Sequence, residues 1–274
     1  MEVDNPEKGS ETISRREFLK RSAFTALAFS KIPDILGNLE NLTPTNDNPE
    51  IDFYENSENQ IIAYNAVRAA AEDFAGIPYT WNTGENYDCG GYVARYFIHL
   101  GFEVARVETP VSEYSPKLGD PMPSGTTVKQ VPYLKMLSQH FGEDLATEIE
   151  LKKLLSDKTI WEKMPPGTVI YLPERIGHHG YDTFTHVGIF MGLNKAKDPL
   201  FAEFSVYMKN GPQYGHDFEQ FTRMYRGQDI EPYNPTNGPL KVFLFNAVEA
   251  SKRIKNTKKK LDHYTKQVNK HQPY

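Results

Sequence analysis

The sequence predicts an α+β fold in which a helix packs against an antiparallel sheet. Apolar residues recur at helical spacing over two segments, 62–74 and 92–97. Three short β-branched and aromatic runs, 166–172, 185–192 and 200–206, follow one another closely enough to form antiparallel neighbours. The composition, with 39% hydrophobic and 12% aromatic residues, is enough to build a core without disulfide or metal cross-links.

Composition divides the 274 residues into four parts. Residues 1–37 form a targeting signal or an amphipathic segment, and residues 38–59, rich in Asn, Pro, Glu, Asp and Thr, read as a linker. Residues 60–250 carry the periodic segments and form the predicted globular domain, which begins with the helix that ends before Gly76 and Pro78. Residues 251–274 form a basic tail.

The N-terminal part contains a match to the twin-arginine export consensus. Residues 14–20 read Ser-Arg-Arg-Glu-Phe-Leu-Lys, and an apolar stretch, 22–29, follows them. This predicts export of a folded protein to the periplasm or the extracellular space. The alternative is an amphipathic helix of a cytoplasmic protein. No apolar stretch reaches the ~18 residues of a membrane-spanning helix.

Cys89 is the only cysteine of the chain. Gly, Asn and Asp residues precede it, and helical spacing follows it, so Cys89 is predicted at or near a helix N-terminus. There the backbone N–H groups and the helix dipole favour an anion, which populates the reactive thiolate. The alternative is a buried cysteine that acts as a small hydrophobic residue.

A candidate base for this thiol lies in the run 185–192. With Val187, Ile189 and Met191 in the core, His186 lies on the opposite face of its strand, and Glu203 on the following run is placed to set its carboxylate beside the imidazole. Two further histidines, His178 and His179, fit no zinc-binding spacing. We expect them at the rim of the cleft, and we expect no metal and no cofactor.

These residues resemble the NlpC/P60 cysteine peptidases of papain-like fold. Tyr79 and Trp81 match the Tyr-x-Trp that precedes the nucleophile in that family, Asp88-Cys89-Gly90-Gly91 is similar to its Asp-Cys-Ser-Gly box, and 186–192 resembles its His-Val-Gly-Ile-Tyr-x-Gly strand. The resemblance covers roughly residues 60–250.

The resemblance implies that Cys89 is the nucleophile, His186 the general base and Glu203 the residue that orients the histidine. It places Tyr79 and Trp81 near the oxyanion and substrate sites. Asp88 either binds a substrate amine or caps the helix. The implied reaction is hydrolysis of an amide in cell-wall (peptidoglycan) peptides. Two alternatives stay open, which are a thiol-dependent acyltransferase and a non-catalytic wall-binding module of the same fold.

The chain departs from the family in two notable ways. Gly90 replaces the serine that usually follows the nucleophile, and residues 103–163 form an insertion between the nucleophile helix and the first strand. Within the insertion we expect a loop over the cleft at 109–126 and helices at 128–141 and 145–155.

The C-terminal tail is strongly basic. From Lys252 to Tyr274 it has eight Lys or Arg against one acidic residue, Asp262, so it carries +7 while the rest of the chain carries −12. Such a tail suits an anionic wall polymer or a phospholipid surface. The alternative is a solvated helix whose apolar stripe packs on the domain. No nucleic-acid-binding motif accompanies the basic residues.

Overall fold

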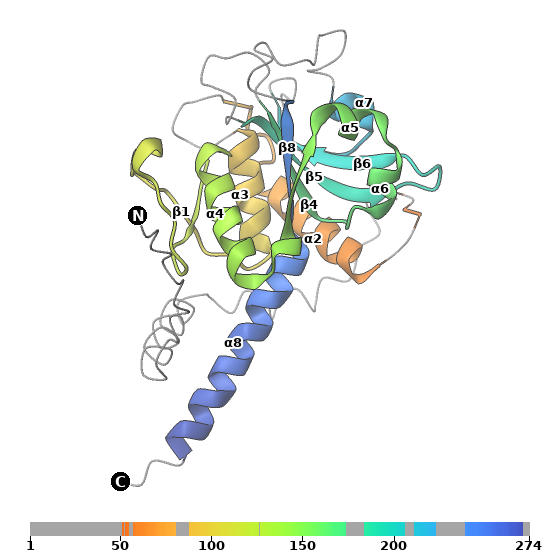
Figure 1. Ribbon diagram of the computed structural model, residues 1–274. Helices are drawn as coiled ribbons and strands as arrows, with labels where there is room; N and C mark the ends of the chain where they lie inside the picture. Colours follow the sequence, from red (N-terminus) through yellow and green to blue (C-terminus); the bar gives the residue numbers. More distant parts are fainter. Residues whose placement is uncertain are drawn as a thin grey trace, which may run out of the picture.

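The computed structural model describes residues 51, 53–54, 57–80, 88–125, 127–173, 184–205, 211–222 and 239–270. Its centre is a six-stranded antiparallel sheet with the strand order β3-β8-β4-β5-β6-β7 (Figure 1). The strands are β3 Ala146–Glu150, β4 Thr168–Pro173, β5 Phe184–Leu193, β6 Pro199–Glu203, β7 Gln213–His216 and β8 Lys241–Asn246. The predicted α+β class with an antiparallel sheet is confirmed.

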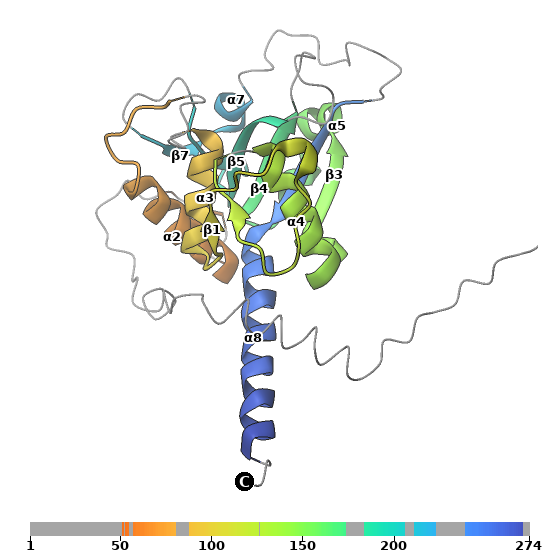
Figure 2. The ribbon, with the colours of Figure 1, turned by 90° about the vertical axis from the view of Figure 1, so that its left-hand side faces the viewer.

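Helices cover both faces of this sheet (Figures 1 and 2). On one face lie α2 (Glu58–Glu72), α3 (Cys89–His99) and α4 (Thr127–Phe141), and on the other α5 (Leu151–Ser156), α6 (Thr159–Lys163) and α7 (Phe218–Phe221). Side chains along β4 point alternately into the two hydrophobic cores, one on each face of the sheet. Val169 and Tyr171 pack on the side of α2 to α4, while Ile170 and Leu172 pack on the side of α5 to α7.

The insertion differs in part from the prediction. The predicted helix 128–141 is confirmed as α4, but a helix over 145–155 is wrong. Residues 143–145 form a 3-10 turn, residues 146–150 form the edge strand β3, and only 151–156 are helical. Pairing of β3 with β8, from Ala146 opposite Phe245 to Glu150 opposite Lys241, overrides the helix propensity of this Glu-containing segment.

The remainder of the insertion is irregular and lies near the start of α3. It contains a short 3-10 turn, Val111–Glu113, and a two-stranded parallel pair, β1 (Val104–Ala105) with β2 (Met122–Pro123). The chain then passes through Ser124 and Gly125 into α4, and Gly125 comes into close contact with α3 at Gly90. The end of the predicted loop 109–126 is therefore a neighbour of the first turn of α3.

The C-terminal helix α8 (Ala247–Lys270) starts inside the domain and then projects from it (Figures 1 and 2). One side of its first two turns is buried, namely residues 247, 248, 250, 251 and 254, and the Ser251 hydroxyl donates to the carbonyl of Leu100 at 2.6 Å. Arg253 forms a bidentate ion pair with Asp144. Among the described helices, α8 included, none is both long enough and apolar enough to cross a membrane.

Candidate active site

Three adjacent strands place three ionisable side chains on one face of the sheet. Gly188 of β5 is the register partner of Glu203 of β6, and Phe201 of β6 is the partner of His216 of β7. Because residues two apart on a strand share a face, His186, Glu203 and His216 form a diagonal row across β5, β6 and β7. All three are buried.

Cys89 is the first residue of α3, as predicted. Asp88 is the N-cap and accepts a hydrogen bond from the backbone N–H of Gly91 at 2.7 Å. This bond satisfies one of the N–H groups that the first turn of a helix leaves without an intrahelical partner. The Cys89 side chain therefore lies at the positive end of the helix dipole, and the residue is 6% exposed.

The structure brings the predicted nucleophile, base and orienter together. His186 Nε2 lies 2.5 Å from Glu203 Oε2, and the thiol of Cys89 lies within hydrogen-bond reach of the same imidazole. Because Nε2 is engaged by the carboxylate, Nδ1 is the ring nitrogen left for the thiol. This is the order of a nucleophile, base and orienter triad.

The surroundings of His186 favour its protonated form. Burial alone lowers the pKa of His186, but hydrogen bonds and charges from Cys89 and Glu203 outweigh burial and raise that pKa to about 10. At neutral pH the imidazole is thus an imidazolium beside the thiol. An imidazolium in this position stabilises a thiolate.

Tyr79 lies against Cys89, its expected neighbour. Its hydroxyl forms hydrogen bonds with the side chain and the backbone N–H of Cys89, and its ring packs edge-on against Phe204 with centroids 5.1 Å apart. Burial, followed by the charges of Cys89 and Asp88, raises the pKa of Tyr79 well above its usual value. The Tyr79 hydroxyl therefore stays protonated and is a donor next to the sulfur.

Asp88 serves as the helix cap, which is one of its two predicted roles. Burial raises the pKa of this carboxyl, although the N–H groups of Gly91 and Gly90 act in the opposite direction. A contact between Asp88 and a substrate amine stays a prediction. Trp81, His178 and His179 lie outside the described residues.

The contact between α3 and the segment 123–125 leaves no room for a side chain at Gly90. A Cβ built on Gly90 would lie 2.9 Å from the carbonyl oxygen of Gly125, closer than real Cβ contacts come. Gln130 of α4 holds the two segments together, since its Nε2 donates to the carbonyls of Gly90 at 3.1 Å and Pro123 at 3.2 Å. The Tyr171 hydroxyl donates to Gln130 Oε1 at 3.0 Å.

Sequence reasoning missed Gln130, Tyr171 and His216. Gln130 sits in a helix whose apolar spacing is otherwise ordinary, and β7 contains only four residues, one of them a glycine. Neither segment carries a motif. Glu203 was predicted because it lies on a β-like run directly after the run of His186, but no comparable pattern surrounds His216.

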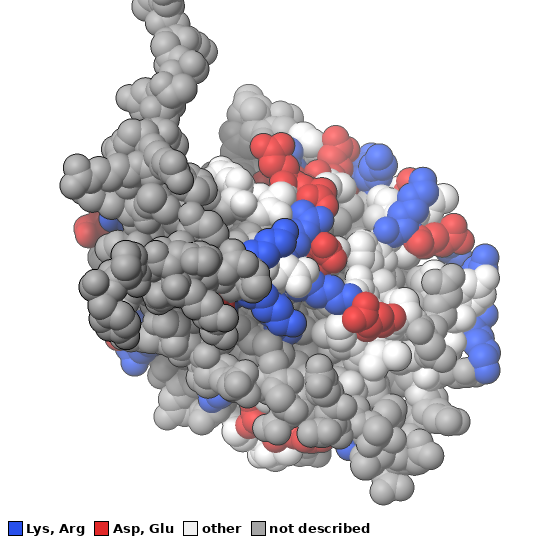
Figure 3. Space-filling model, turned by 90° about the horizontal axis from the view of Figure 1, so that it is seen from below, with Lys and Arg blue, Asp and Glu red and all other residues white. Residues whose placement is uncertain are grey.

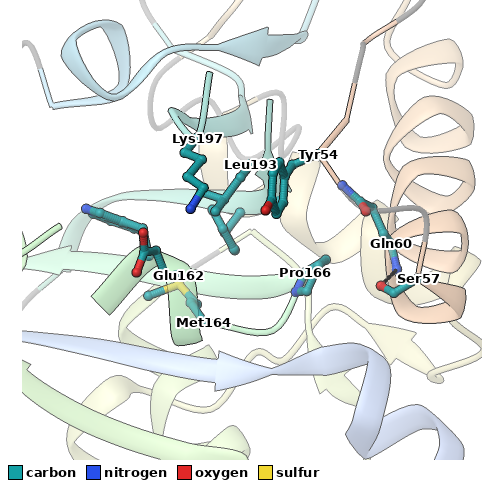
Figure 4. A pocket seen from close by; sticks show the side chains of 11 residues that line it. Tyr54, Ser57, Gln60, Glu162, Met164, Pro166, Leu193 and Lys197 are labelled. Carbon is teal, nitrogen blue, oxygen red and sulfur yellow. Dashed lines mark hydrogen bonds between the residues drawn. The ribbon is translucent and has the colours of Figure 1, made fainter. Parts of the chain in front are cut away.

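A separate cavity of about 270 Å³ lies at the other end of β5 (Figure 4). Gly192, which lines this cavity, comes six positions after His186 along β5, so the two residues are about 20 Å apart. Figure 4 shows Lys197 and Tyr54 on one side and Gln60 and Ser57 on the other. The cavity is therefore not part of the Cys89 centre.

No cluster of three or more His, Cys, Asp or Glu suited to a metal ion occurs in the part of the chain that the structure describes. No protein-family model matches the chain, and comparisons with curated proteins and with solved structures found no match.

Proposed function

We propose that this protein is a cysteine-dependent amide hydrolase of papain-like fold that acts on cell-wall peptides. The observation that supports this proposal best is the buried contact of Cys89 with His186 and of His186 with Glu203. The proposed nucleophile lies at a helix N-terminus, and the proposed base lies on the sheet. The resemblance of the segments around Cys89 and His186 to the NlpC/P60 peptidases supplies the fold family and the substrate class.

The contacts support a two-stage mechanism. The Cys89 thiolate attacks the amide carbonyl carbon, and the carbonyl π electrons move to oxygen. The Tyr79 hydroxyl and the Cys89 N–H, which contact each other beside the sulfur, are the donors that we expect to stabilise this oxyanion. The C–N bond then breaks, and the leaving amine takes a proton from the His186 imidazolium.

The second stage returns the enzyme to its starting state. Neutral His186 accepts a proton from water as the water oxygen attacks the acyl carbon. The C–S bond breaks, the acid product leaves, and Cys89 is again a thiolate beside the imidazolium. Glu203 keeps the imidazole ring oriented in both stages through its 2.5 Å contact with Nε2.

The test is hydrolysis of a set of purified cell-wall peptides, followed by mass spectrometry. We expect cleavage by the wild type, loss of cleavage in Cys89→Ala and His186→Ala, and retention in His99→Ala. His99 is the matched control, because it pairs with Asp73 at 3.0 Å at the other end of α3. Transfer of the acyl group to an added amine would favour an acyltransferase. Binding to sacculi with an unreactive Cys89 would overturn the enzymatic proposal.

We also propose that the protein is exported by the twin-arginine route, on the strength of residues 14–20, which lie outside the described residues. Replacing both Arg15 and Arg16 by Lys is expected to retain the protein in the cytoplasm. Fractionation of cells that express the two forms is the measurement, and equal export of the double variant would contradict the proposal.

We also propose that the helix α8 binds an anionic polymer or an anionic membrane surface. Figure 3 shows Lys and Arg interspersed with Asp and Glu over the described part of one face of the protein. The excess of positive charge is instead a property of the run Lys252–Lys270 along α8. Attraction to an anionic surface therefore depends on this projecting helix.

A further inference from the structure

The cavity at the end of β5 distant from His186 has the size and lining of a site for a small molecule. Its volume of about 270 Å³ is many times the space that one water molecule needs, and it is slightly below that of pockets for drug-sized ligands. Most of its wall is apolar or aromatic and comes from Trp161, Met164, Pro166, Phe190 and Leu193. A small ligand with an apolar body can therefore be buried there.

Two side chains of opposite charge lie at one end of this cavity (Figure 4). Lys197 belongs to the turn between β5 and β6, and Glu162 belongs to α6. The Lys197 ammonium lies over the ring of Tyr54, 5.3 Å from the ring centroid, an arrangement that leaves its N–H groups available to an anion. Among the described residues, neither Lys197 nor Glu162 has an ion-pair partner. This end of the cavity therefore offers a cation and an anion to a ligand.

The backbone conformation of Lys197 fixes its side chain at the cavity. In the part of the chain that the structure describes, Lys197 is the only non-glycine residue with a positive φ, at +65°. Its N–H donates to the carbonyl of Asn194 at 2.9 Å and closes the turn. Glycine or asparagine adopts this conformation at lower cost, so the turn itself does not require a lysine. The position of the ammonium at the cavity is what a lysine adds here.

Neutral polar groups lie at the other end of the cavity (Figure 4). Gln60 is 3% exposed, and its Nε2 donates to the carbonyl of Met191 at 3.4 Å. A carbonyl only accepts, so this contact decides the orientation of the amide and directs Oε1 away from Met191. Gly192 leaves space for the amide, since a Cβ there would contact Nε2.

The acceptor Oε1 of Gln60 is without a donor from any described residue, although buried polar atoms are normally hydrogen-bonded. Beside it, the Ser57 hydroxyl accepts from the backbone N–H of Gln60 at 3.3 Å and keeps its own proton to donate. This end of the cavity therefore suits a neutral group that both donates and accepts one hydrogen bond, which describes a hydroxyl.

We propose that this cavity binds a free aromatic α-amino acid with a phenolic hydroxyl, that is, an amino acid of the tyrosine type. The α-carboxylate pairs with Lys197 and the α-ammonium pairs with Glu162. The phenol ring contacts the wall around Trp161 and Phe190, whose rings are 5.9 Å apart. The phenolic hydroxyl donates to Oε1 of Gln60 and accepts from Ser57. The proposal goes beyond the proposed function and does not depend on it.

The first test is isothermal titration calorimetry of the full wild-type chain with four ligands that differ by one group. L-tyrosine carries all three groups, tyramine lacks the carboxylate, 3-(4-hydroxyphenyl)propionate lacks the ammonium, and L-phenylalanine lacks the hydroxyl. We expect saturable binding of L-tyrosine and binding about tenfold weaker for each analogue, because each leaves one polar group of the cavity without its partner. Absence of binding by L-tyrosine, or equal binding of all four ligands, would overturn the proposal.

The second test assigns each ligand group to a side chain. Lys197→Asn keeps a residue that tolerates the positive φ and should abolish the preference for L-tyrosine over tyramine. Glu162→Gln should abolish the preference over 3-(4-hydroxyphenyl)propionate. Both positions are exposed, so these variants are expected to fold. Lys195→Asn is the matched control, because Lys195 lies in the same turn but does not line the cavity, and it should bind L-tyrosine like the wild type.

Gln60→Leu is the variant for the hydroxyl end and should abolish the preference for L-tyrosine over L-phenylalanine. Because Gln60 is buried, circular dichroism must first show that this variant folds, and the two exposed variants test the proposal if it does not. His186→Ala should bind L-tyrosine like the wild type. Binding lost in His186→Ala but retained in Lys197→Asn and Glu162→Gln would place the ligand at the Cys89 centre and overturn the proposal. Failure of the hydrolase assay would leave this result unaffected.

Discussion

Replacing Gly90 by alanine tests whether the insertion sets the position of the nucleophile. The added Cβ would lie 2.9 Å from the Gly125 carbonyl oxygen and 3.2 Å from its carbon, and both atoms belong to backbone that cannot rotate away. Overpacking of this kind costs about 1–3 kcal/mol. Alanine in place of glycine in a helix returns up to about 1 kcal/mol. We therefore expect a net loss of about 1 kcal/mol in the free energy of unfolding.

The same substitution should also slow the chemistry of the neighbouring Cys89. Either α3 or the segment at Gly125 must move, and a shift in the start of α3 changes the position of the sulfur relative to His186. We expect the iodoacetamide alkylation rate at pH 7 to fall about tenfold, since reactivity depends steeply on the position of the reacting groups. Gly90→Ser, which also adds a Cβ at this position, should behave in the same way.

The assays are urea unfolding and alkylation of the folded protein, with Gly76→Ala as the matched control. Gly76 has no atom within 4 Å of an added Cβ, but its φ of +75° strains an alanine. That variant should lose about 1 kcal/mol of stability and keep the alkylation rate of the wild type. A Gly90→Ala protein that is more stable than the wild type and equally reactive would refute the reasoning.

Three further predictions follow from other contacts. The pKa of His186 is raised to about 10 by its contacts with Cys89 and with Glu203, against the effect of burial. Glu203→Gln removes the Glu203 share, so the imidazolium should lose its proton about 1–2 pH units lower, as followed by NMR titration of His186. The control Glu148→Gln, at an exposed position, should leave that midpoint in place, and an unmoved midpoint in Glu203→Gln would contradict the assignment. Tyr96→Phe removes the buried hydrogen bond to the carbonyl of Gly167 at 3.1 Å and should lower the free energy of unfolding, measured by urea denaturation, by about 1–2 kcal/mol. The control is Tyr54→Phe at a half-exposed position. A loss in Tyr96→Phe no larger than in this control would contradict the prediction. Reversal of three charges of α8, at Lys258, Lys259 and Lys260, should weaken co-sedimentation with phosphatidylglycerol vesicles in low salt and leave the unfolding curve unchanged; undiminished binding would show that α8 is not the contact.

The sequence predicts those site residues that local patterns mark, but not those that reach the site through contacts between distant segments. Cys89 could be placed at a helix start, and His186 beside Glu203, because punctuation, helical spacing and period-two alternation are local patterns. Whether the whole domain is papain-like remains a proposal, although its α+β class and antiparallel sheet are as predicted.

The features that were not predicted depend on contacts between distant segments. The edge strand β3 exists because residues 146–150 pair with β8, and no pattern within 146–150 distinguishes that pairing from a helix. Gln130 and His216 acquire their roles only when α4 reaches Gly90 and β7 reaches Glu203. No local sequence pattern marks polar residues of this kind, because their partners are far away in the sequence and come close only in the folded chain.

The environment of Cys89 bears on the alternative of a cysteine kept only for packing. A structural cysteine is usually surrounded by apolar side chains. Here the same buried region also holds His186 at 6% exposure and Glu203 at 1%, with His216 behind them. Burying ionisable groups costs free energy, and apolar residues of similar volume in their place are often neutral or stabilising. Packing therefore gives no reason for these buried polar residues, whereas activation of a thiol requires a base at the sulfur and an acceptor at the other ring nitrogen of that base.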